Sequence, residues 1–281
     1  MPPANILGII LSLISAATWG GGDFFGGLST RKHDQYAVLV VSAAAGILVL
    51  IICTLIWPEP FPVWPLGLWA VLAGLSGVIG LGTLYKALSL GHSAVVAPTS
   101  AVIGAAIPVI FGMINDGFPD LTKIVGFGLA FIGIWMVSRV SGESSKATSS
   151  SLLLAILAGI GFGGFYIFIT LAGPSSTFTP LIISRTTFFV TTSLLMVSLH
   201  GKMGRAIWSP TVWMTGLFDA GGNAFYMLAK QFTRIDVAVV LSSLYPAMTV
   251  ILSRIFLKEH ISRYQWLGVG ICFAAIVLIT V

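Results

Sequence analysis

Long apolar runs separated by short polar turns fill the chain from one end to the other. Ten of these runs are long enough to cross a membrane as helices, because a spanning helix needs about 20 mostly apolar residues. They cover residues 5–28, 36–57, 66–90, 93–114, 122–140, 151–171, 179–199, 210–230, 235–257 and 264–281. The pattern predicts an all-α polytopic membrane protein with ten transmembrane helices. A transmembrane β-barrel does not fit, because its strands need only about 9–11 residues and alternate in polarity.

The most polar stretch of the chain, residues 141–151, lies between the fifth and sixth runs and has the composition of a short flexible linker. We therefore expect a first five-helix unit over residues 1–140, a linker over 141–150 and a second five-helix unit over 151–281. Turn-forming residues such as those at 117–120 and 173–177 mark other boundaries between runs.

The two units share a sequence pattern. Gly126 and Gly128 reappear 142 residues later as Gly268 and Gly270, and the same spacing aligns residues 19–22 with the glycine-rich stretch 161–164. An odd number of helices in each unit places the second unit upside down relative to the first, so the repeat is predicted to be inverted. Inverted repeats are typical of secondary transporters, whose substrate sites lie between the two halves.

Composition supports the membrane class. Hydrophobic residues make up 57% of the chain and charged residues 8%, with a mean hydropathy of +1.01, whereas a soluble domain carries about 25% charged residues. The net charge of +5 does not indicate nucleic-acid binding, because the Lys and Arg residues sit mostly between the apolar runs. Cys53 and Cys272 lie inside runs, so no disulfide framework is expected. The first run starts at Ile6 without a basic segment before it, so we expect no cleaved signal peptide.

The second unit carries three recognisable features. Residues 237–250 contain a Ser-Leu-Tyr-Pro motif, residues 257–261 form a Lys-Glu turn with His260 in place of a usual Arg, and residues 265–270 open a glycine-rich last helix. Together they resemble the EamA family of the drug/metabolite transporter superfamily, and the resemblance extends over essentially the whole chain. The first unit matches less well, since Ile103-Gly104 stands where Tyr-Pro would be. The resemblance implies ten helices, alternating access and a central cavity for a small metabolite.

Two carboxylates lie within the runs, where a charge costs about 2.5–3.5 kcal/mol on insertion scales and is therefore a functional candidate. Asp219 is near the middle of the eighth run, and Asn223 lies one turn later on the same face. We expect Asp219 to hold a proton or a cation and Asn223 to orient it, with an inter-helix polar clamp as the alternative. Asp23 is a second candidate for a substrate cation or a coupling proton, unless it pairs with Arg31 or Lys32 at the helix end.

Aromatic residues accompany these carboxylates along the runs. The candidates for substrate contact are Trp19, Tyr85, Phe165, Tyr166, Tyr226 and Tyr245. Aromatic walls beside carboxylates suit amines, quaternary ammonium groups or aromatic zwitterions, whereas ordinary helix packing is the alternative for most of them. Trp19 and Tyr245 are the strongest candidates, because the resemblance places them on inner helices. Arg185, near the start of the seventh run, is expected to anchor that helix at the membrane interface, with contact to a substrate carboxylate as the alternative.

Glycines and prolines suggest gating positions. Gly20, Gly21 and Gly22 allow either close helix approach or local unwinding of the first helix. Pro98 and Pro108 are expected to interrupt the fourth helix and Pro246 the ninth, since proline frees a carbonyl and kinks a helix. Because these helices are repeat partners, paired kinks could act as hinges, with static kinks as the alternative.

We expect a secondary transporter that moves an amino acid, an amine or a related small metabolite by alternating access, with proton coupling left open. A multidrug or quaternary-amine exporter, an intramembrane enzyme and a non-transporting scaffold are the alternatives. Enzymatic activity, a cofactor and a metal site are not expected, because no Walker loop is present and all four His residues lie at the ends of runs.

The expected partners are a small-molecule substrate and the lipid bilayer, with protons left open as a further partner, no nucleic acid and a monomer as the oligomeric state. We expect an integral protein of a prokaryotic plasma membrane. Four Lys and Arg residues lie at the ends of the runs on the side of the termini and ten at the opposite ends, which favours termini outside the cell. The family resemblance instead implies termini inside.

Overall fold

The computed structural model describes residues 3–89, 93–138, 148–174, 176–258 and 260–280, and this part of the chain is helical without strands. The helices are α1 (Pro3–Thr30), α2 (Gln35–Ile56), α3 (Trp64–Ser89), α4 (Ser93–Asp116), α5 (Leu121–Ser138), α6 (Ser149–Ala172), α7 (Phe178–Ser198), α8 (Pro210–Ala229), α9 (Ile235–Ser242), α10 (Tyr245–Phe256) and α11 (Arg263–Thr280), with a short 3-10 turn, η1 (Ala206–Trp208), before α8. Most of the predicted linker, 141–150, lies outside the described residues.

The described helices form ten spans, which confirms the predicted fold class. Nine spans are both long and apolar enough to cross a membrane, with α9 and α10 together counting as one span. The tenth is α8, whose 20 residues extend over about 30 Å. It is less apolar because it carries Asp219 and Asn223, and it packs against α1 and α2.

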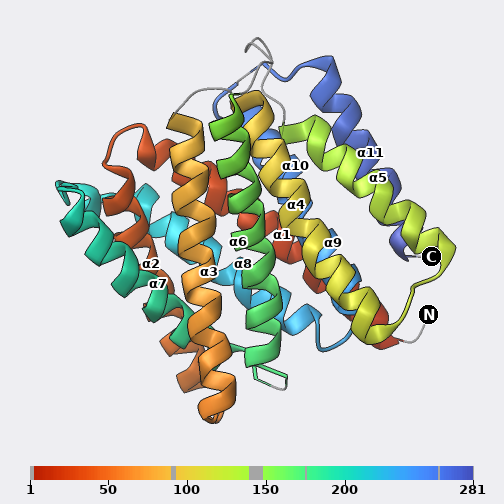
Figure 1. Cartoon of the computed structure of the whole chain (residues 1–281), viewed down its shortest axis with the longest axis horizontal. Coiled ribbons are helices and arrows are strands. Elements are labelled where there is room, and N and C mark those ends of the chain that lie inside the picture. Colours follow the sequence, from red (N-terminus) through yellow and green to blue (C-terminus); the bar gives the residue numbers. More distant parts are fainter. Residues whose placement is uncertain (1–2, 90–92, 139–147, 175, 259, 281) are drawn as a thin grey trace.

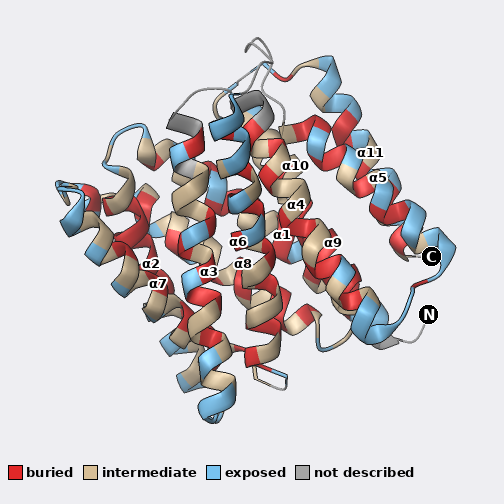
Figure 2. Ribbon diagram, viewed as in Figure 1, coloured by how far each residue is buried: buried red, intermediate tan, exposed pale blue. Residues whose placement is uncertain are grey.

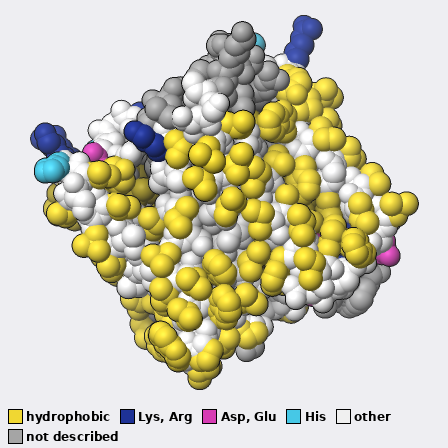
Figure 3. All heavy atoms as spheres, viewed as in Figure 1, with side chains coloured by type: hydrophobic (Ala, Val, Ile, Leu, Met, Phe, Trp, Pro, Cys, Tyr) yellow, Lys and Arg dark blue, Asp and Glu magenta, His cyan; other side chains and the backbone are white. Residues whose placement is uncertain are grey.

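The outer surface of the bundle is apolar. Large hydrophobic side chains such as Ile52, Leu55, Ile110 and Ile114 are exposed, and pale-blue exposed positions lie along the outward faces of the helices in Figure 2. Figure 3 shows hydrophobic side chains over the visible face, with Lys and Arg gathered toward one end. An apolar surface of this extent is unsuited to water and matches the hydrocarbon of a bilayer. The protein is therefore an integral membrane protein.

The helix packing has the symmetry of an inverted repeat. Figure 1 shows α5 beside α11 at one edge of the bundle and α2 beside α7 at the other. The counterparts of α1 and α8 in the other half are α6 and α3, and the structure contains both the α1–α8 contact and the α6–α3 contact. The counterparts of α4 and α6 are α9 and α1, and both the α4–α6 and the α9–α1 contacts are likewise present. The match extends to residues, since Trp19 of α1 lies against Gly222 of α8 and Gly161 of α6, which stands 142 residues after Trp19, lies against Gly80 of α3.

The backbones of α3 and α6 touch at Gly161. A Cβ atom on Gly161 would lie 2.5 Å from the backbone nitrogen of Gly80 and 2.9 Å from the carbonyl oxygen of Ser76. Because a helix backbone cannot move aside as a flexible side chain can, Gly161→Ala should lower the free energy of unfolding by about 1–3 kcal/mol. Thermal unfolding in detergent checks this against Gly82→Ala, where an added Cβ meets nothing within 4 Å. Equal melting temperatures for the two variants would contradict this packing of α3 on α6.

The two halves differ where proline was expected to break helices. Residues 243–244 separate α9 from α10, and Pro246, the second residue of α10, has no N–H with which to continue the helical hydrogen bonds. By contrast, α4 runs unbroken through Pro98 and Pro108, so the predicted interruption of the fourth helix is wrong. Gly104, which stands 142 residues before Pro246, keeps its N–H, so the first half lacks the residue that accompanies the break in the second.

The first helix also stays continuous through Gly20, Gly21 and Gly22. These glycines allow close approach rather than unwinding. A Cβ on Gly20 would lie 2.6 Å from Met248 of α10, and one on Gly21 would lie 2.9 Å from the ring of Phe218 on α8. The hinge roles of these glycines and of the prolines stay predictions.

Candidate functional site

A cavity of about 200 Å³ lies between the two halves of the bundle. Helices α1 to α4 line it from the first half, and α6, α7, α8 and the α9–α10 break line it from the second. Its polar and aromatic lining consists of Trp19, Asp23, Ser100, Phe162, Phe165, Tyr166, Ser184, Arg185, Phe188, Asp219, Asn223, Ser243 and Tyr245. A polar cavity at the repeat interface is the position in which transporters with inverted repeats bind substrate.

The structure brings most of the predicted substrate-contacting residues together in this cavity. Those that line it are Trp19, Asp23, Phe165, Tyr166, Asp219, Asn223 and Tyr245. Tyr226 does not line it, because its side chain is fully buried behind the wall and its hydroxyl is 2.9 Å from Thr170 Oγ1. The side chain of Tyr85 lies outside the described part of the chain. The binding roles of these residues stay predictions.

Arg185 and Asp219 form an ion pair in the cavity wall. The Arg185 side chain passes Gly46 of α2, and its guanidinium carbon lies 5.7 Å from the centroid of the Phe188 ring. From the sequence, Arg185 was expected at the membrane interface, whereas the structure places it on the cavity surface. Its position about two turns inside the seventh helix was the available signal, because a deeply placed Asp calls for a deeply placed cation.

Asp23 differs from Asp219 in having no counter-ion. Its side chain is exposed to the cavity, which Asp219 also lines. Among the described residues it has no hydrogen-bond or ion-pair partner, so the pairing at the helix end that the sequence left open is not observed. Asn223 also departs from expectation in detail, since its Nδ2 donates to the Asp219 backbone carbonyl at 2.6 Å rather than to the carboxylate.

Three aromatic rings from different helices, Trp19, Tyr166 and Tyr245, form one wall of the site, and a fourth, Tyr226, packs behind it. Trp19 lies at the centre, with its ring centroid 5.6 Å from Tyr166, 6.4 Å from Tyr245 and 6.1 Å from Tyr226. The indole rests against α8 at Gly222, where a Cβ atom would lie 2.4 Å from the ring. Tyr226 therefore supports the wall from behind, and the cavity offers ring faces that attract cations and stack on planar or apolar surfaces.

Polar contacts gather at the end of the bundle that carries both chain termini. Glu59, in the α2–α3 loop, accepts hydrogen bonds from the backbone N–H groups of Thr177, Phe178 and Thr179 at 2.7–3.3 Å. These groups open α7, and no side chain of α7's own N-terminus caps them. Glu59 therefore supplies the helix cap from another loop, where a carboxylate also complements the helix dipole.

Residues after α8 extend this set of contacts. Lys230 donates to the carbonyl oxygens of Thr170, at 3.1 Å, and Gly173. Gln231 Nε2 donates to Thr177 Oγ1 at 2.9 Å. The α8–α9 loop is thereby joined to the end of α6 and the start of α7.

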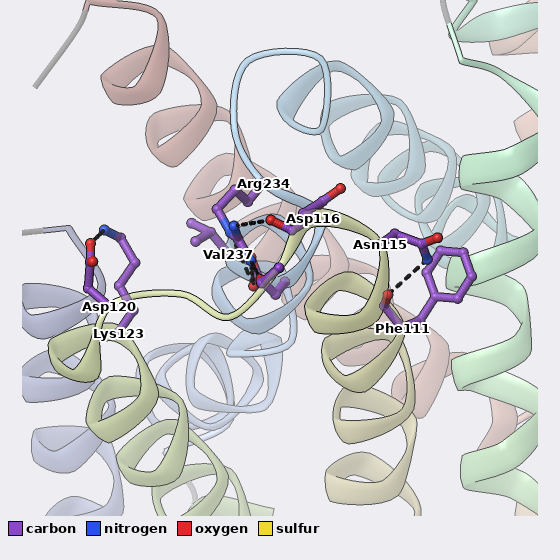
Figure 4. A network of polar contacts seen from close by, with 9 residues as sticks. Phe111, Asn115, Asp116, Asp120, Lys123, Arg234 and Val237 are labelled. Carbon is purple, nitrogen blue, oxygen red and sulfur yellow. Dashed lines mark hydrogen bonds and ion pairs between the residues drawn. The ribbon is translucent and has the colours of Figure 1, made fainter.

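Figure 4 shows the remaining contact, between the α8–α9 and α4–α5 loops. Arg234 donates to the backbone carbonyls of Asp116, at 2.9 Å, and Gly117, and to the buried carboxylate of Asp236 at 2.8 Å. The hydrogen bonds to Asp236 raise the pKa of Arg234 above its ordinary value, so this guanidinium stays charged. We call Glu59, Lys230, Gln231 and Arg234 the termini-side latch. Glu59 and Arg234 join loops of one half to the other, and Lys230 and Gln231 join loops of the second half to each other.

Glu59→Gln should lower the free energy of unfolding by about 1–2 kcal/mol, because an amide replaces a carboxylate that accepts several backbone hydrogen bonds. Asp120→Asn is the matched control on the same side. The Asp120 side chain is 84% exposed and pairs only with Lys123 at 3.3 Å, so its loss should change little. Thermal unfolding of both variants checks the difference, and an equal effect would mean that Glu59 does not cap α7.

The EamA-like transporter family matches this sequence twice, over residues 6–139 and 149–281. The chain belongs to the EamA-like transporter family. The predicted family is thereby confirmed, and this EamA-like protein is accordingly a membrane transporter. The two matches cover the two halves of the bundle that are related by the repeat.

Individual relatives of this EamA-like protein add fold and context. A Staphylococcus aureus (strain COL) protein named "Putative ribose uptake protein RbsU" is 24% identical over 274 residues, which are 91% of this chain and 90% of that one. An uncharacterized protein of Methanocaldococcus jannaschii is 31% identical over 131 residues, 46% of this chain but 95% of its own length. A solved crystal structure covers 96% of this chain and 95% of its own with a TM-score of 0.76, and at 15% identity it shows the fold alone.

Proposed function

We propose that this protein is a secondary transporter that moves a small organic metabolite by alternating access through the central cavity. The observation that carries the proposal is the cavity itself, in which both halves place aromatic rings and charged groups deep within an apolar bundle. Charged groups in such a position are costly and are typically retained for binding or for coupling. Family membership supports transport, and the inverted repeat supports alternating access.

The termini-side latch supports a state closed on one side. It joins the α2–α3 and α4–α5 loops of the first half to the α6–α7 and α8–α9 loops of the second. We take this latch to be the closed gate. With Arg185 in the cavity, three Lys and Arg residues remain near the termini and ten lie toward the opposite ends of the spans. The charge distribution therefore favours an extracellular latch.

Two substrate classes fit the cavity. A sugar the size of ribose is the first candidate, because a relative that covers 91% of this chain carries ribose uptake in its name. Carboxylate, guanidinium and amide groups can hydrogen-bond hydroxyls, and the Trp19 ring can stack on a sugar face. An amine is the second candidate, because Asp23 has no counter-ion among the described residues and lies beside aromatic rings.

Thermal unfolding of the purified protein with ribose, amino acids, amines, choline and nucleosides tests the proposal first. A ligand that binds only the folded state raises the melting temperature. At 100 times its Kd it adds about 2.7 kcal/mol to the free energy of unfolding. Each hit is then measured for uptake into proteoliposomes, with protein-free liposomes as the control. Uptake of a hit supports the proposal. Binding without uptake would favour a scaffold, and chemical conversion of the hit would favour an intramembrane enzyme.

A further inference from the structure

The cavity holds an unbalanced charge. Among its described lining residues, Asp23, Asp219 and Arg185 are the ones that carry charge. Arg185 and Asp219 pair with each other, so their charges cancel, and the negative charge of Asp23 is left over. An unpaired carboxylate enclosed by an apolar bundle is strongly disfavoured relative to one in water, so the site requires a positive charge from outside the chain.

The described residues around Asp23 provide rings and no counter-ion. Asp219 of α8 lines the same cavity with a like charge, and Tyr166 of α6 and Tyr245 of α10 line it with their rings. Arg185, from α7, is directed to Asp219. Trp19 lies one turn before Asp23 on the same face of α1. A carboxylate bordered by aromatic rings is the arrangement that binds an ammonium group by charge and by cation–π attraction.

Resting on the transport function proposed above, we propose that Asp23 is the exchangeable cation site of the cavity, filled by a proton or by the ammonium group of a substrate, and that Arg185 keeps Asp219 out of this exchange. Because of the ion pair, Asp23 rather than Asp219 holds the exchangeable proton or cation that the sequence led us to expect on Asp219. When an ammonium substrate arrives, the proton on Asp23 leaves for the water on the open side. When a neutral substrate binds, the proton remains on Asp23 and travels with it.

Arg185 makes the proposal specific, because it sets the number of exchangeable charges. Arg185→Gln removes the partner of Asp219 and leaves two unpaired carboxylates side by side. The variant should therefore bind one more proton than the wild type on acidification. Asp219→Asn removes the other partner, and Arg185 is then free to neutralise Asp23, so this variant should bind one proton fewer.

Infrared difference spectroscopy of the purified protein in lipid, between alkaline and acid pH, measures this directly through the C=O band of protonated carboxyl groups. We expect one band in the wild type that is assignable to the cavity, its loss in Asp23→Asn and a second band in Arg185→Gln. Retention of the full wild-type signal in Asp23→Asn overturns the proposal, as does an unchanged signal in Arg185→Gln. If Asp23→Asn fails to fold, Asp23→Glu replaces it, because it keeps a carboxyl group at this position. The cavity band should then remain but shift in frequency, and an unshifted band overturns the proposal.

Proteoliposomes loaded with a pH-sensitive dye separate the two sources of positive charge. Added tyramine should drive protons out of the vesicles as it enters, whereas added ribose should carry protons in. In Asp23→Asn the coupled proton movement should be lost, because the amide cannot exchange the proton. If the wild type and Asp23→Asn take up a solute at the same rate and neither moves protons, this inference is overturned and the transport function stands. Absence of uptake for every ligand that binds overturns the transport function itself.

Discussion

Arg185→Gln should lower the free energy of unfolding by about 2–3 kcal/mol, and adding Asp219→Asn should recover at least half of that loss. Removing one partner of a buried ion pair leaves an uncompensated charge, whereas removing both leaves none. The expected cost is below that of a fully enclosed pair, because the Asp219 side chain is 36% exposed to the cavity while that of Arg185 is 14% exposed. Asp219→Asn alone should cost less than Arg185→Gln, since Arg185 can then turn toward Asp23.

A double-mutant cycle measured by unfolding of the purified protein tests this ordering. We expect a favourable coupling energy between Arg185 and Asp219 and almost none between Arg185 and Asp120, an exposed carboxylate outside the cavity. Losses that simply add in the double variant would show that the two side chains do not act as a pair.

Gly222→Ala should reduce uptake about tenfold or more while leaving the protein folded. An added Cβ would lie 2.4 Å from the Trp19 ring, so the indole must shift from its place between Tyr166 and Tyr245. Because a side chain can move where a backbone cannot, the cost falls on the shape of the cavity more than on stability, and displacements of about 1 Å are enough to impair a functional site. Uptake kinetics together with thermal unfolding separate the two effects.

Gly27→Ala is the matched control for this substitution, because an added Cβ there meets nothing within 4 Å. Wild-type uptake by Gly27→Ala and a strong loss in Gly222→Ala would support the placement of Trp19 in the transport cavity. Wild-type uptake by both variants would mean that the Trp19 ring does not contribute to substrate passage.

The helices were predictable from the sequence because the bilayer imposes their length. Each predicted run overlaps a helix of the structure, and even α8, the least apolar, was found despite Asp219 and Asn223. The clustering of Trp19, Asp23 and Tyr245 could also be predicted, because ionisable residues within membrane spans face the interior of the bundle or a cavity.

The tertiary pairings were not predictable in the same way. Glu59 caps a helix that begins 119 residues later, and Arg185 meets Asp219 across a gap left by Gly46, which no local pattern encodes. Helix α4 is continuous, whereas its counterpart is divided into α9 and α10. This difference accompanies Gly104 in the first half and Pro246 at the equivalent position in the second. Whether Asp23 or Asp219 is unpaired follows only from that three-dimensional arrangement.

Counterflow across proteoliposomes tests the central claim most directly. Vesicles are loaded with a high concentration of unlabelled ribose, or of the solute that the thermal screen identifies, and a trace of the labelled solute is added outside. A carrier that exposes one cavity alternately to each side should accumulate label inside above its external concentration before the overshoot decays. Label that only rises to equality, as through an open channel, or that never enters, would contradict alternating access through this cavity.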